Sequence, residues 1–84
     1  MNDEQDLIAR WIEQNPYRPG LGEARVIGYG VPVWALVGYR LMVEGDADRI
    51  ADDYDLPREA VVAALAYYRR HRAVIDARIA ANAA

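Results

Sequence analysis

Side chains that carry out enzyme chemistry are scarce in this sequence. Serine, threonine and cysteine are all absent, which removes the common hydroxyl and thiol nucleophiles. The single histidine, His71, lies in an arginine-rich run at residues 69–72, where positive charge repels metal ions, so we expect it at the surface. We therefore expect a protein that is not an enzyme, holds no cofactor and acts on no small-molecule substrate.

Acidic side chains cluster in the middle of the chain and raise the question of a cation site. Their spacing does not fit a calcium-binding loop, because the glycine and the terminal glutamate of that loop are missing. A solvated helix face explains the cluster better, and we expect no metal site there. The five residues are Asp46, Asp48, Asp52, Asp53 and Asp55.

Positive charge is confined to the C-terminal third. Residues 1–55 hold five arginines and eleven acids, whereas residues 56–84 hold five arginines and two acids. A strongly basic domain is the usual electrostatic signature of nucleic-acid binding, and this chain has a net charge of −3. Any DNA binding must therefore be local.

Residues 45–68 have the pattern of a helix-turn-helix, in which a short helix and a tight turn with one aliphatic plug, Leu56, precede a second helix that Pro57 opens. An ordinary helical hairpin gives the same pattern, and the sequence does not separate the two. If the motif reads DNA, the exposed first turns of the second helix do so, which offers Arg58, Glu59 and Val62, with Arg69 further on. Because the preceding helix is acidic, we expect such binding to be weak.

The adjacent tyrosines Tyr67 and Tyr68 precede two arginines, Arg69 and Arg70. Aromatic and basic side chains together can stack on single-stranded bases. A pair of tyrosines on one helix more often places one ring in the core and the other in an interface. We favour the second interpretation.

The expected elements define a small all-helical domain with a short N-terminal strand or extended arm. Proline and glycine separate helices expected at residues 3–14, 31–43, about 46–54 and 57–81, and residues 24–27 are prone to form a strand. Residues 1–23 are expected to form an N-terminal helix and loop, and residues 24–84 a helix-turn-helix domain with a long C-terminal helix.

Two apolar surfaces are expected to need a partner chain. Residues 33–37 are apolar on every side, which requires more than one covering neighbour, and the last helix is longer than a domain of this size is wide. We expect its C-terminal half to project and to form a dimer or partner interface. The interface residues predicted are Val33, Trp34, Leu36, Val37, Tyr68, Arg72, Ile75 and Ile79.

Features of membrane proteins are missing from the sequence. No apolar run approaches the roughly 20 residues that span a bilayer. The acidic start at residues 1–4 differs from the basic start of a signal peptide. A cytoplasmic location is expected.

Four stretches give the chain a resemblance to the DUF433 family of short bacterial proteins. They are VPVWAL at residues 31–36, EGD at 44–46, IADDYDL at 50–56 and VVAALAYY at 61–68. The resemblance covers about residues 24–72. It implies a homeodomain-like helix-turn-helix similar to VapB-type antitoxins, which are commonly encoded beside a PIN-like ribonuclease toxin. Where the family has a Gly-Thr-Arg-type turn, this chain has Gly28-Tyr29-Gly30, without the arginine.

The function expected from this resemblance is that of an antitoxin. The chain would form a homodimer, bind and neutralise a PIN-like toxin protein, and bind its own operator DNA weakly. A stand-alone transcriptional regulator and a helical assembly module without DNA binding remain the alternatives. A neighbouring gene for a PIN-like nuclease favours the antitoxin, and salt-dependent binding to upstream DNA favours the regulator.

Overall fold

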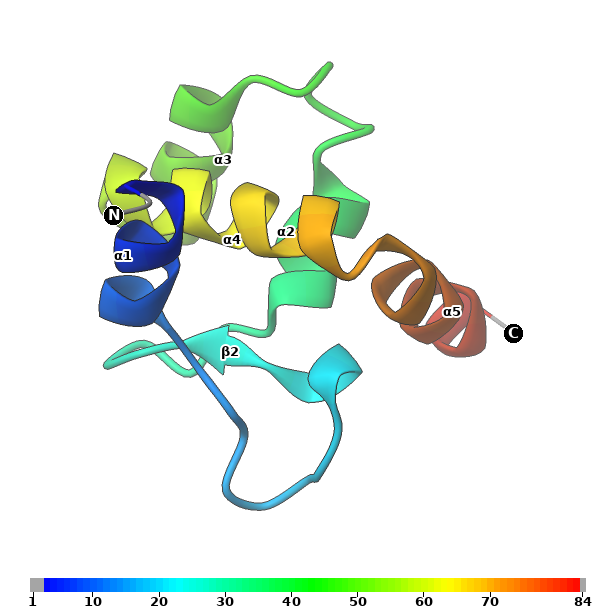
Figure 1. Cartoon of the computed structure of the whole chain (residues 1–84). Coiled ribbons are helices and arrows are strands. Elements are labelled where there is room, and N and C mark those ends of the chain that lie inside the picture. The colour runs from blue at the N-terminus through cyan, green and yellow to red at the C-terminus, as the bar shows by residue number, and fades with distance from the viewer. Residues whose placement is uncertain (1–2, 84) are drawn as a thin grey trace.

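The computed structural model describes residues 3–83, which are mostly helical with one small two-stranded sheet (Figure 1). In chain order the elements are helix α1 (Asp3–Trp11), strand β1 (Ile12–Glu13), the 3-10 helix η1 (Leu21–Glu23), strand β2 (Arg25–Val26), and helices α2 (Val33–Tyr39), α3 (Ala47–Tyr54), α4 (Arg58–Arg70) and α5 (Arg72–Ala83). The expectation of a mainly helical domain with a short strand is confirmed.

The first helix ends earlier than its sequence pattern predicts. It stops at Trp11, and the next two residues form β1, which pairs antiparallel with β2 so that Ile12 lies opposite Val26. Both of these side chains are buried in the core. The extended conformation therefore buries Ile12 against the chain that returns through β2, and this tertiary contact overrides the local helical pattern.

Helix α4 is the centre of the fold. Its buried residues include four alanines, Ala60, Ala63, Ala64 and Ala66, whose small side chains let neighbouring helices approach closely. Helices α1, α2 and α3 all pack against it. The expected N-terminal segment at residues 1–23 thus contributes α1 to the same core as residues 24–84.

The connection between α3 and α4 follows the sequence prediction closely. The side chain of Asp46 caps α3 by accepting hydrogen bonds from the backbone N–H groups of Asp48 and Arg49. Asp55 ends α3 in the left-handed conformation, with φ of 55°. Leu56 is buried beneath this turn, as predicted.

The prediction of one long, projecting C-terminal helix is wrong. The helix breaks at His71, and α5 turns to pack against α2 and η1 (Figure 1). Its Ile75 is 0% exposed, so the break places an apolar side chain in the core that a straight helix would leave in solvent. Gly22 permits the contact, since a Cβ at that position would lie 3.1 Å from Val74 Cγ1.

Helix α2 is covered by its own chain, which corrects the expectation that residues 33–37 need a partner. Val33, Leu36 and Val37 are buried where α2 packs against α4 and α5. The helix is also shorter than predicted, because residues 40–45 form turns that lead into α3.

Candidate functional site

The exposed side of α4 carries most of the residues predicted to read DNA. Arg58, Val62 and Arg69 are spaced by four and seven residues, which places them on one helix stripe. The two arginines are exposed and Val62 is half-buried. Glu59 is exposed beside this stripe, and one of its carboxylate oxygens lies 4.0 Å from Arg10 on α1.

Both arginines of this stripe already contact carboxylates. Arg58 Nε donates a hydrogen bond to Asp48 Oδ1 at 2.6 Å, and Arg69 donates to Glu4 Oε2 at 3.3 Å. A DNA phosphate or base edge would have to compete with these ion pairs. The helices on either side add acidic groups, with Asp3 and Asp6 on α1 and further aspartates on α3. The electrostatics of this face therefore oppose DNA rather than attract it.

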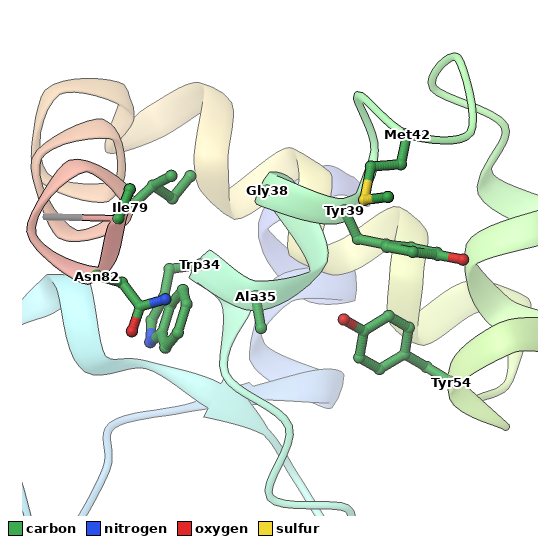
Figure 2. Close-up of a pocket in the computed structure, with 9 residues that line it drawn as sticks. Trp34, Ala35, Gly38, Tyr39, Met42, Tyr54, Ile79 and Asn82 are labelled. Atoms are coloured by element: carbon green, nitrogen blue, oxygen red, sulfur yellow. The ribbon is translucent and has the colours of Figure 1, made fainter.

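An apolar groove of about 410 Å³ lies on another part of the surface, along α2 and between α3 and α5 (Figure 2). Helix α2 and the turn after it supply most of its lining, and α5 closes one side. The lining residues are Trp34, Ala35, Gly38, Tyr39, Met42, Tyr54, Ile79, Asn82 and Ala83.

Two tyrosines form one end of the groove. The rings of Tyr39 and Tyr54 meet edge to face, with centroids 5.3 Å apart and planes at 72° (Figure 2). The Tyr39 hydroxyl donates a hydrogen bond to Asp53, which also accepts one from Arg49 Nε at 3.2 Å. The hydrogen bond to Asp53 raises the pKa of Tyr39, and the same bond lowers the pKa of Asp53. These contacts tie α2 to α3.

Trp34 forms the opposite end of the groove. The Arg78 guanidinium lies over its indole ring, 4.4 Å from the centroid, and Arg78 Nε donates to Glu23 Oε1 at 2.7 Å. This chain of contacts joins α2, α5 and η1. Met42, on the turn after α2, lines the groove and is 78% exposed. The groove therefore combines aromatic ends with an unbranched, polarizable side chain open to solvent.

The model of a family described as "Protein of unknown function (DUF433)" matches residues 12–68. The chain belongs to the DUF433 family. No curated protein and no solved structure matches it. The matched region runs from β1 into α4 and includes α2 and α3, whereas α5, which closes the groove of this DUF433 protein, lies beyond it.

The predicted interface residues separate into three groups in the DUF433 fold. Trp34 and Ile79 line the groove, and Tyr68 and Arg72 line a separate pocket. The other four are buried in the core of the single chain, so a partner cannot reach them in this conformation. These are Val33, Leu36, Val37 and Ile75.

Several groove residues were not predicted from the sequence, among them Gly38, Tyr39 and Met42. A signal for them was present, because Trp34, Gly38 and Met42 follow one another at intervals of four and so share a helix face. The pattern did not single out that face, because the other sides of the same segment are also apolar. Without the positions of α3 and α5, no pattern indicated which face remained open.

Within residues 3–83, no three His, Cys, Asp or Glu side chains are grouped so that they could hold a metal ion. No helix in this part of the chain is long and apolar enough to cross a membrane.

Proposed function

We propose that this DUF433 protein acts by binding another protein in the groove between α2, α3 and α5, without catalysing a reaction. The observation that carries the proposal is the groove itself, which is open, apolar and edged by aromatic rings. Apolar concavities with aromatic walls are preferred sites for anchoring side chains of partners. Met42, which is 78% exposed, adds apolar surface that a partner would cover.

The proposed partner is a PIN-like ribonuclease toxin, which makes the protein an antitoxin-like component of a toxin-antitoxin pair. Negative charge on and just before α3, which contributes Tyr54 to the groove, favours a basic partner. Asp52 and Glu44 are exposed there, as is Asp53, which is paired with Arg49. A ribonuclease binds a polyanion and so carries positive charge on its substrate-binding surface. Apolar anchoring in the groove and attraction to α3 would act together.

Binding to operator DNA through a homeodomain-like helix-turn-helix is the second proposed role. The capped α3, the turn at Asp55 and Leu56, and the exposed stripe on α4 favour it. The ion pairs of Arg58 and Arg69 make it the weaker role. Autoregulation would then be limited to high protein concentration, or to a complex in which the partner contributes DNA contacts.

The deciding experiment is co-expression with the product of the adjacent gene, followed by affinity capture and measurement of the dissociation constant. Met42→Glu should weaken capture at least tenfold, because it places a charge in the groove. Leu41→Glu is the matched control, as it adds the same charge at a similarly exposed residue that does not line the groove. Light scattering of the free protein and of the complex would give the stoichiometry, including any homodimer.

Two outcomes would overturn this function. If Met42→Glu captures the partner as well as the parent does, the groove is not the binding site. If the parent captures no product of the adjacent gene, the antitoxin role is wrong.

A further inference from the structure

The arginines of this acidic chain are nearly all neutralised within the chain itself. Ten arginines are present, and eight have a carboxylate oxygen of residues 3–83 within 4.0 Å. Within that part of the chain, no such ion pair forms at Arg40 or at Arg72. These two arginines are therefore the exception to the pattern of the molecule.

Both exceptions converge on one side chain, Tyr68. The guanidinium carbon of Arg40 lies 4.8 Å from the centroid of the Tyr68 ring, and that of Arg72 lies 5.2 Å from it. Arg40 also donates a hydrogen bond to the Tyr68 hydroxyl at 3.3 Å. The hydroxyl in turn donates to Asp76 Oδ1 at 2.8 Å. A buried aromatic ring thus holds two like charges near each other at the end of α4.

A pocket of about 180 Å³ opens at this point. Arg69 joins Arg40 and Arg72 in its lining, with Tyr68, Leu65 and Gly45 completing the wall. The volume exceeds the roughly 10–15 Å³ that a cavity needs in order to hold one water molecule. The pocket shares no lining residue with the apolar groove and is independent of the partner site proposed there.

The positive charge that lines this pocket favours the binding of an anion. Holding two unneutralised guanidinium groups together is unfavourable, and Arg40 Nε is buried without a hydrogen-bond partner in the described residues. Arginine presents its N–H donors in a planar fork that matches phosphate oxygens. We propose that the pocket formed by Arg40, Arg69, Arg72 and Tyr68 binds a phosphate group.

The phosphate could belong to a nucleic-acid backbone or to a small phosphate compound. If it belongs to a nucleic acid, the position of the pocket determines which part of α4 contacts it. Arg69 lies eleven residues after Arg58, about 16 Å along α4 at 1.5 Å per residue. A nucleic acid bound here would be held through its backbone and not read by the first turn of α4. Two nearby carboxylates oppose an anion: Asp76, which accepts the Tyr68 hydrogen bond at the edge of the cluster, and Glu4, which accepts a hydrogen bond from Arg69.

The test is titration of the full-length protein with inorganic phosphate, followed by backbone amide NMR, with a parallel titration using a short DNA duplex. Phosphate should shift the amides of Gly45, Tyr68 and Arg72. Arg72→Gln should weaken phosphate binding at least tenfold, and Asp76→Asn should strengthen it while keeping an oxygen that accepts from Tyr68. Arg18→Gln is the matched control, because it also removes an exposed arginine. Arg18 does not line the pocket, and neither does Glu23, its ion-pair partner.

The duplex titration identifies the source of the phosphate. If the duplex binds and Arg72→Gln reduces the dependence of log K on log salt by about one, the pocket holds a backbone phosphate. If inorganic phosphate binds and the duplex does not, the ligand is a small phosphate compound, and the proposal still stands.

The proposal is overturned if phosphate shifts no amide around the pocket, or if Arg72→Gln and Arg18→Gln bind it equally. Acetate that binds as tightly as phosphate would also overturn it, because the pocket would then serve a carboxylate of a protein partner. Thermal melting of each variant shows that it is folded, and Arg72 is exposed enough for Arg72→Gln to leave the fold intact.

Discussion

Arg58 and Asp48 join the first turn of α4 to the first turn of α3, with Arg58 Nε 2.6 Å from Asp48 Oδ1. Both side chains are exposed, so the pair contributes little to stability, on the order of 0–1 kcal/mol. Its main consequence is for the prediction that Arg58 reads DNA, because the ion pair holds the Arg58 guanidinium against a carboxylate of α3.

Substitutions of the two members of this pair should change the affinity for DNA in opposite directions. If the first turn of α4 reads operator DNA, Asp48→Asn should raise affinity several-fold because it releases Arg58, and Arg58→Ala should lower affinity several-fold. Fluorescence anisotropy with upstream DNA at fixed, low salt measures both. Equal binding by Arg58→Ala and the parent at matched salt would show that this turn does not contact DNA.

Leu56 beneath the turn between α3 and α4 should be essential for folding. Leu56→Asp buries a carboxylate without a partner at a site that is 7% exposed, and we expect it to cost several kcal/mol and unfold the domain. Circular dichroism during thermal melting measures the loss. Leu41→Asp, at an exposed position, should melt close to the parent. A cooperative melt of Leu56→Asp within a few degrees of the parent would contradict the buried position.

Local signals in the sequence predicted α3, the start of α4 and the turn between them well. Asp46 at the cap, Leu56 in the turn and the inward residues Val61 and Ala64 follow from short-range pattern and capping chemistry, and the structure places each as expected. These features depend on residues within a turn or two of one another.

Long-range packing decided what the sequence did not predict. Nothing near His71 breaks a helix, yet burial of Ile75 against α2 and η1 makes the break favourable. The same packing covers α2 from within the chain and leaves Trp34, Gly38 and Met42 facing the groove. The pocket at Tyr68 could not be predicted from the sequence either, because it joins Arg40 to residues almost thirty positions away.

The ion pairs between α1 and α4 predict how stability depends on pH. Arg70 and Arg69 donate hydrogen bonds to Glu4 and lower its pKa from the ordinary value of 4.5. A carboxyl whose pKa is lower in the folded state stabilises the fold above pH 4.5, and this contribution is lost as the pH falls through the folded pKa. Glu4→Gln should therefore be less stable than the parent at pH 7 and equal to it at strongly acid pH.

Urea denaturation of the parent and Glu4→Gln across this range would measure that difference. Asp3→Asn, in the same turn of α1, is the control for removing a charge there. The gap between parent and Glu4→Gln should narrow in 1 M salt, which screens exposed pairs. A gap that is the same at pH 7 and at pH 2 would mean that Glu4 acts through something other than its charge.

The sharpest test of the fold concerns α5, because two neighbouring residues on it differ completely in burial. Ile75 is 0% exposed and belongs to the core, whereas Val74 beside it is 41% exposed. Ile75→Ala should lower the free energy of unfolding by roughly 2–5 kcal/mol, while Val74→Ala should change it by less than about 1 kcal/mol.

Truncation after Arg72 should likewise destabilise the domain, since it uncovers α2 and η1. Measuring the melting temperature and, by light scattering, the mass in solution distinguishes this result from the one expected for a projecting helix. If α5 projected, the truncated chain would keep its melting temperature and only its mass in solution would change.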